Sequence, residues 1–170
     1  TGAVVVNHEG HGFYRVSYDH HLRERLVRNL DSLEVLERYH LIDDAWNEVL
    51  AGRATAEDML TLITAMSAES TLAVWQAMIN ALRQLARAMP EERRAGFATT
   101  CADICRPALR RLGDPQPADT ELDASLRGLL IRTLGTLGAD SDTIAWCRST
   151  VEQARAGASV DAEVLAAATV

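Results

Sequence analysis

The sequence has no lysine and few aromatic residues, and both deficits exclude classes of protein. All 17 basic residues are arginine, the formal net charge is −7, and aromatic residues make up 5% of the 170 positions. Nucleic-acid binding depends largely on neutralising phosphate groups. Because no segment interleaves basic with aromatic residues, we expect no nucleic acid among the partners.

Cysteines and long apolar runs are also scarce. Cys101, Cys105 and Cys147 are an odd number in a chain too large to need covalent cross-links, which predicts a reducing, cytoplasmic compartment. No apolar run approaches the roughly 20 residues that cross a bilayer, and the first residues lack the charged and apolar regions of a signal peptide. We therefore expect no membrane partner.

Most of the chain has the pattern of amphipathic helices. Leucine and alanine dominate the apolar residues, which favours helices over sheets. After Asp19 the apolar period becomes 3.6, and glycines and polar capping residues separate the segments. These signals predict helices over residues 20–30, 32–51, 55–67, 71–89, 91–112, 120–137, 141–156 and 160–169.

Apolar stripes on these helices indicate how they pack. One stripe comprises Leu72, Trp75, Ile79, Leu82, Ala86 and Met89, and a second comprises Leu122, Leu126, Leu129, Leu130, Thr133 and Leu137. Short connections force successive helices into antiparallel pairs. We therefore predict an all-α, right-handed superhelix of the HEAT or armadillo kind over residues 19–170, with a possible break at the proline-bearing linker 113–118.

The first 18 residues have a different period. Residues 3–7 are mostly β-branched and residues 12–18 alternate with a period of two, which predicts a β-hairpin over residues 1–18. Unpaired strand edges invite pairing with another chain. We expect self-association through this edge, which carries Val4, Val6, Tyr14 and Val16.

Two groups of residues resemble metal ligands without matching a metal site. His8 and His11, with Glu9 between them, are three residues apart in a predicted turn, whereas the zinc motif H-E-x-x-H needs a four-residue spacing on a helix. Cys101 and Cys105 share a helix face, but free cysteines are usually buried. We expect these cysteines in the core, and we predict no metal, catalytic or cofactor-binding residue.

The adjacent acids Asp43 and Asp44 are expected to have structural roles. On a helix they point about 100° apart, so they cannot jointly clamp one ion. We expect one of them to pair with Arg15 or Arg38. Asp19 is positioned to cap the first helix.

Three stretches resemble the aminopeptidase N type of zinc metallopeptidase. Asn7 and the run G-F-Y-R-V-S-Y-D from Gly12 to Asp19 are similar to the family's N-x4-G-[FY]-Y-R-V-x-Y-D. The run R-Y-H-L-I-D-D-A-W that starts at Arg38 is similar to R-x-x-L-I-D-D-A-[FW], and Glu69 with Trp75 matches a weaker third pattern. The motif residues to which we assign structural roles are Asn7, Gly12, Tyr14, Arg15, Tyr18, Asp19, Arg38, Asp43 and Asp44.

The resemblance implies a non-catalytic part of a larger enzyme. In that family the zinc and the catalytic residues lie in a preceding domain, a β-sandwich follows, and a helical superhelix closes over the active site. Residues 1–18 would end the sandwich, and residues 19–170 would form a superhelix that stops short of its natural end. The expected partners are the parent's other domains and its peptide substrate, with Arg110 or Arg132 meeting the peptide carboxylate.

Two other functions remain open on the residues alone. A free-standing α-solenoid could bind a protein partner along its concave face. A small metalloprotein would use His8, His11 and the cysteines. A reading frame that continues upstream into an H-E-x-x-H helix would exclude the free-standing scaffold.

Overall fold

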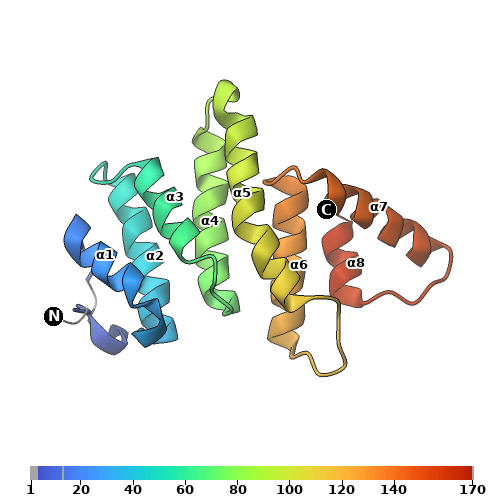
Figure 1. The fold of residues 1–170 in the computed structure, drawn as a ribbon, viewed down its shortest axis with the longest axis horizontal. Coiled ribbons are helices and arrows are strands. Elements are labelled where there is room, and N and C mark those ends of the chain that lie inside the picture. Colours follow the sequence, from blue (N-terminus) through green and yellow to red (C-terminus); the bar gives the residue numbers. More distant parts are fainter. Residues whose placement is uncertain (1–3, 13, 170) are drawn as a thin grey trace. The chain divides into compact units, whose positions relative to one another are not determined.

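The computed structural model describes residues 4–12 and 14–169, and the elements in these residues are helices (Figure 1). Two short 3-10 helices, η1 and η2, span His8–Gly10 and Leu30–Ser32. The α-helices of the described residues are α1 (His20–Arg28), α2 (Val35–Leu50), α3 (Ala56–Ala65), α4 (Leu72–Ala88), α5 (Glu91–Leu112), α6 (Glu121–Thr136), α7 (Ser141–Arg155) and α8 (Ala162–Ala168). The prediction of an all-α chain is confirmed, and each predicted helix is present within a few residues of its expected bounds.

The chain divides into two compact units, residues 1–81 and 82–170. In the first unit, α2 contacts both η1 and α3. Its core contains large, fully buried side chains from four helices, namely Leu26, Ile42, Met59, Ile63, Trp75, Met78 and Ile79. These side chains lie on the apolar stripes of their helices, so the period of 3.6 determines which face each helix buries.

The second unit is organised around α6, which contacts α5, α7 and α8. Cys101 and Cys105 of α5 are fully buried, as predicted, and so is Leu130 of α6. A smaller cluster joins Ile131 of α6 to Val164 and Ala167 of α8. Contact of α6 with the helix before it and with the next two is the pattern of stacked helix pairs.

Local side-chain bonds explain where several helices begin. Thr55 and Thr120 each accept a hydrogen bond from the backbone amide three residues later, and the aspartate at that later position bonds back to the threonine amide. Such capping boxes satisfy amides that the first helical turn leaves unpaired. Asp19, Asp140 and Asp161 cap α1, α7 and α8 with single bonds.

One residue of the predicted stripes is placed wrongly. Leu122 is 65% exposed, because it lies in the first turn of α6, before the buried part of the helix begins at Leu126. The rest of the stripe from Leu126 onward is buried or half-buried.

The predicted β-hairpin is not found, since residues 4–12 and 14–18 contain no strand. Asn7, at the end of the first expected strand, has a positive φ angle of 66°, which an extended strand does not allow. Side chains also take the backbone groups that strand pairing would use. The Asn7 amide bonds both the N–H and the C=O of Gly12, and the Tyr18 hydroxyl bonds both those of Val6. Val16 was expected on an exposed strand edge, but it is buried. Residues 1–3 and Phe13, which were also part of the predicted hairpin, lie outside the described residues.

Within the described residues, no helix combines the length and the apolar character that a membrane crossing requires.

Candidate functional site

The motif residues near the N-terminus meet those of α2 around one cleft of about 500 Å³. We call it the motif cleft. Its lining includes six of the nine residues to which the sequence assigned structural roles, namely Asn7, Gly12, Tyr14, Arg15, Asp43 and Asp44. Two motif patterns that are separate in the sequence therefore form one structural feature.

Three ionic or polar contacts fasten the N-terminal segment to α2. Arg15 donates to Asp43 at 3.0 Å, which confirms the predicted pairing of one adjacent acid with this arginine. The hydroxyl of Ser17 donates to Glu48 at 2.9 Å, and the His8 ring contacts the buried carboxylate of Glu37 at 2.6 Å. The segment is thus held along the acidic residues of a single helix.

The pKa values of two acids on α2, Asp44 and Glu37, are shifted. Burial raises the pKa of Asp44, which is only partly opposed by a backbone hydrogen bond from Val16. Burial also opposes ionisation of Glu37, but hydrogen bonds from His8 and from backbone amides outweigh it and lower the pKa of Glu37. Glu37 is therefore an anion that stabilises the docked segment.

Glycines allow the segment to lie close to α2. A Cβ atom at Gly10, where φ is +72°, would lie 2.8 Å from Leu36 Cδ2 and 2.9 Å from His40 Cε1. A Cβ at Gly12 would meet the ring of Tyr14 at 2.0 Å. The positive φ of Gly10 disfavours any residue with a side chain at that position. At Gly12 the contact is with the exposed ring of Tyr14, which can move aside, so the structure gives no steric reason for the glycine of the first motif.

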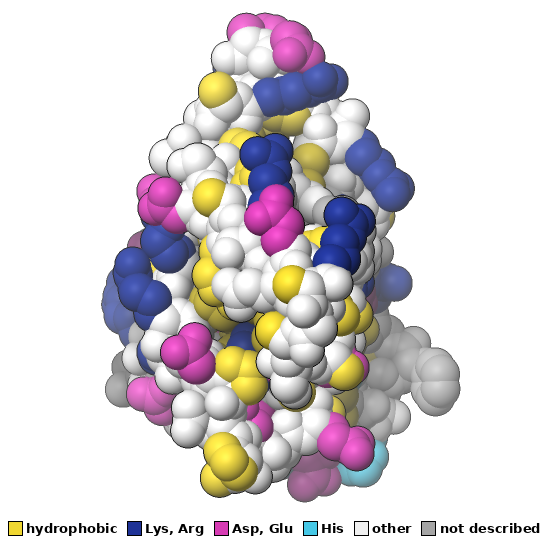
Figure 2. All heavy atoms as spheres, turned by 90° about the vertical axis from the view of Figure 1, so that its right-hand side faces the viewer, with side chains coloured by type: hydrophobic (Ala, Val, Ile, Leu, Met, Phe, Trp, Pro, Cys, Tyr) yellow, Lys and Arg dark blue, Asp and Glu magenta, His cyan; other side chains and the backbone are white. Residues whose placement is uncertain are grey.

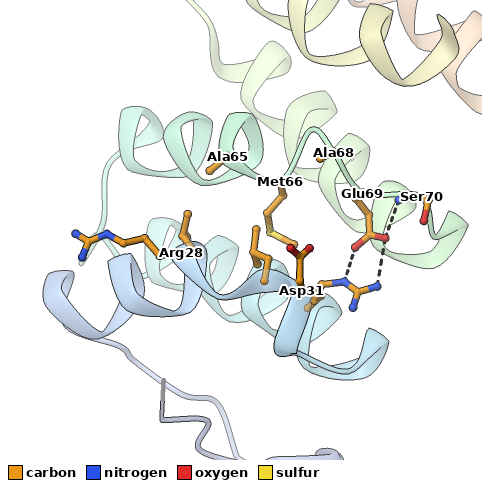
Figure 3. A pocket seen from close by; sticks show the side chains of 10 residues that line it. Arg28, Asp31, Ala65, Met66, Ala68, Glu69 and Ser70 are labelled. Carbon is orange, nitrogen blue, oxygen red and sulfur yellow. Dashed lines mark hydrogen bonds and ion pairs between the residues drawn. The ribbon is translucent and has the colours of Figure 1, made fainter. Parts of the chain in front are cut away.

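A second feature joins the second motif pattern to the third, around Glu69 (Figure 3). Arg38 of α2 donates to the two carboxylate oxygens of Glu69 at 2.6 and 3.3 Å and to the carbonyl of Leu33 at 2.6 Å. The indole N–H of Trp75 donates to the backbone carbonyl of Glu69 at 2.9 Å. Burial raises the pKa of Glu69, but the Arg38 guanidinium and nearby amides outweigh it, so the net pKa is lowered. Arg38, from the second motif pattern, therefore anchors the loop that contains Glu69 of the third pattern.

The residues that resembled metal ligands have other partners. His8 and His11 are each bonded to a glutamate, Glu37 and Glu9 respectively. Burial raises the pKa of Cys101 and of Cys105 to about 12, so both are neutral thiols of the core. Among the described residues no three histidines, cysteines or acids are arranged to hold a metal ion, so these residues do not fit the zinc that the family resemblance implies for the parent.

Sequence reasoning missed two ion pairs in the second unit. Arg106 of α5 pairs with Asp140, the N-cap of α7. Arg127 of α6, which is buried, donates to Asp119 at 2.6 Å and to the carbonyl of Gly113 at 2.9 Å. In each pair the acid lies in a connecting loop, at or just before the start of a helix. An acid at such a position was therefore the sequence signal that could have indicated these ion pairs.

The two arginines proposed as peptide contacts lie in different surroundings. Arg110 lines a groove of about 460 Å³, together with the apolar side chains of Ile131, Trp146 and Val164. Arg132 is half-buried, and its Nε atom has no hydrogen-bond partner among the described residues. The face drawn in Figure 2 shows basic and acidic side chains interspersed with apolar patches, without a field of one sign.

The sequence is similar to parts of known aminopeptidases. It is 31% identical to aminopeptidase M1-A of Oryza sativa subsp. japonica over 145 residues and 29% identical to aminopeptidase M1 of Arabidopsis thaliana over 143 residues, each alignment covering 81% of this chain. It is also 29% identical to tricorn protease-interacting factor F2 of Thermoplasma acidophilum over 131 residues, which cover 77% of this chain. The chain spans only 16% of the length of each of these relatives.

The family comparison covers nearly the whole chain. Residues 3–169 match the model of the ERAP1-like C-terminal domain. This match confirms the resemblance inferred from the three motif patterns, which had placed the chain in the C-terminal region of an aminopeptidase N-type enzyme. The chain belongs to the ERAP1-like C-terminal domain family.

Proposed function

We propose that this chain is the non-catalytic C-terminal module of a zinc aminopeptidase, where it closes the active-site chamber and shapes the access of peptides. The observation that carries the proposal is the family match over residues 3–169, together with aminopeptidase relatives of which this chain covers only 16%. Zinc binding and peptide-bond hydrolysis would belong to the remainder of the parent protein.

The proposed wall is a right-handed superhelix of antiparallel helix pairs. Its support in the second unit is the contact of α6 with α5, α7 and α8, which is the arrangement of consecutive stacked pairs. The ion pair between Arg127 and Asp119 and the one between Arg106 and Asp140 fix the connecting loops. A wall with fixed loops would limit the size and length of a peptide that enters the chamber.

The motif cleft is proposed as the joint with the preceding β-sandwich of the parent. The N-terminal segment is held on α2 by Arg15, Ser17 and His8. A movement of the β-sandwich that displaces this segment would therefore also displace α2.

The cysteines support a reducing, cytoplasmic compartment for the parent, because all three are free and none forms a disulfide.

The proposed peptide contact is Arg110, with Arg132 as the other candidate. An arginine can hold a carboxylate through two parallel hydrogen bonds. Arg110 is exposed, makes no hydrogen bond or ion pair within the described part of the chain, and lies beside apolar side chains. It is thus available to a peptide that ends in an apolar residue.

The decisive experiment compares the full-length parent enzyme with a form that lacks this module. We expect the truncated form to retain hydrolysis of a small aminoacyl-anilide and to lose its dependence on peptide length. Hydrolysis of peptides by the 170-residue chain alone would contradict the proposal. A reading frame with no metallopeptidase domain upstream would also contradict it and would favour the free-standing scaffold.

The arginine contact is tested separately in the full-length parent. Arg110→Ala should raise KM several-fold for a long peptide with a free C-terminus and should leave an amidated peptide unaffected. Arg132→Ala tests the second candidate, and Arg148→Ala, at an exposed position of α7, is the matched control. Unchanged kinetics for both Arg110→Ala and Arg132→Ala would reject the contact without affecting the proposal for the module.

A further inference from the structure

Two adjoining pockets form one groove along α1 and α3 in the first unit. They have volumes of about 400 and 290 Å³ and share Val27, Arg28 and Ala65 in their linings. We call this feature the α1–α3 groove. Its first pocket reaches Asp31 and Met66 (Figure 3). The shared residues make the groove longer than either pocket alone.

Apolar side chains line both pockets of the groove. Val27 of α1 and Ala65 of α3 belong to both, Leu62 lines the second pocket, and Leu30 and Met66 line the first. An apolar surface of this kind gains free energy when it is covered by the apolar side chain of a ligand. The groove therefore favours a ligand with an apolar part.

The charges of the first pocket leave one carboxylate without a partner. Arg28 is paired with Glu24 at 2.7 Å, and Arg38 is paired with Glu69. Asp31, by contrast, has no hydrogen bond or ion pair with any residue that the structure describes. In Figure 3 its carboxylate points into the pocket, near Met66, whereas the Arg28 side chain points away. Asp31 is thus an exposed carboxylate of the pocket that has no direct partner and lies beside apolar atoms.

We propose that the α1–α3 groove binds an extended polypeptide segment with an arginine or lysine side chain against Asp31 and an apolar side chain against Val27 and Ala65. Charge complementarity selects the basic residue. The second, continuous pocket selects a polypeptide over a small amine, because a single amine would leave that pocket unfilled. This binding site is additional to the proposed role of the module in a peptidase.

The test uses the 170-residue chain and short peptides with acetylated and amidated ends, in which one to three glycines separate a leucine from an arginine. Counterpart peptides contain citrulline, which has nearly the shape of arginine without its charge. Binding is followed by NMR titration of the isotopically labelled chain. We expect at least one arginine peptide to bind about fivefold more tightly than its citrulline counterpart, the gain that one half-exposed ion pair provides.

Variants locate the effect. Asp31→Asn should abolish the preference for the arginine peptide over its citrulline counterpart. Ala65→Phe should weaken the binding of both peptides, because the larger side chain fills the junction of the two pockets. Glu57→Gln is the matched control, because it removes an exposed carboxylate of the same unit that does not line the groove. Circular dichroism verifies that each variant retains its helices.

The proposal would be overturned by equal affinities for arginine and citrulline peptides, or by a preference for arginine that persists in Asp31→Asn. Agmatine binding as tightly as the best peptide would indicate a site for small amines and would contradict the polypeptide assignment. Chemical-shift changes confined to residues outside α1 and α3 would also reject it.

Discussion

The contact between His8 and Glu37 is one of the three that hold the N-terminal segment on α2, and its contribution should depend on pH. The hydrogen bond to Glu37 raises the pKa of His8, with smaller contributions from the charges of Glu9 and Glu34. A histidine with a raised pKa stabilises the folded state below its unfolded pKa of about 6.5, and this contribution is lost as pH rises through the raised value. The lowered pKa of Glu37 ends the effect at acidic pH, because protonation of Glu37 removes the anion.

The attachment of the segment should therefore weaken as the solution becomes alkaline. We predict that the His8 ring titrates above 6.5 in an NMR pH series, and that Glu37→Gln returns its pKa toward that value. Glu9→Gln, which removes a more distant charge, should have a smaller effect. A His8 titration that is identical in the wild type and Glu37→Gln would show that the 2.6 Å contact is not maintained in solution.

Pairings of residues could be predicted only where the sequence limited the choice. We expected Arg15 or Arg38 to pair with one of the adjacent acids Asp43 and Asp44, and Arg15 is the one that pairs with Asp43. Arg38 instead pairs with Glu69, 31 positions later. Periodicity shows which face of a helix is polar, but it does not show which loop will lie against that face.

At the scale of the helices and loops, local signals predicted the helices well. Capping residues and apolar periods act within a few residues of each other, so the sequence contains the needed information. The prediction of an N-terminal hairpin was wrong because local signals did not contain the needed information. The alternating sequence is present, but no strand forms, because the bonds of Asn7 to Gly12 and of Tyr18 to Val6 take the backbone groups of the expected strands. Those bonds depend on turn geometry that an alternating pattern does not indicate.

Two leucines of the predicted α6 stripe should respond differently to truncation of their side chains. Leu130 is fully buried, so Leu130→Ala should lower the free energy of unfolding by about 3 kcal/mol. Leu122 is 65% exposed, so Leu122→Ala should change it by less than about 0.5 kcal/mol. Urea unfolding of both variants tests this within one helix. Similar losses at the two positions would mean that Leu122 is covered in solution.

At the scale of the whole molecule, the structure consists of two compact units of helices, and most of its contacts are between helices close in sequence. Composition and period sufficed to predict this class. The functional residues were harder to predict, because the groove between α1 and α3 and the motif cleft both depend on tertiary packing. The family motifs pointed to residues of the motif cleft, but no sequence pattern indicated the α1–α3 groove.

Self-association of the chain is still expected, because the N-terminal segment has exposed apolar residues. Val4, Val6 and Tyr14 are 53%, 44% and 56% exposed, although no strand edge accompanies them in the described residues. We expect the chain to self-associate weakly and the triple change Val4→Ser, Val6→Ser and Tyr14→Ser to reduce this in sedimentation velocity. A strictly monomeric wild type at high concentration would end the prediction.

The loop between α5 and α6 has one further consequence. The Arg127 guanidinium binds Gly113 and Asp119, the two ends of this loop, whereas residues 114–118 between them are exposed. Because the ends are clamped independently of what joins them, added residues in the middle cost only a small closure entropy. Relatives should therefore differ in length here, and an inserted epitope tag or labelling sequence should leave both helices intact.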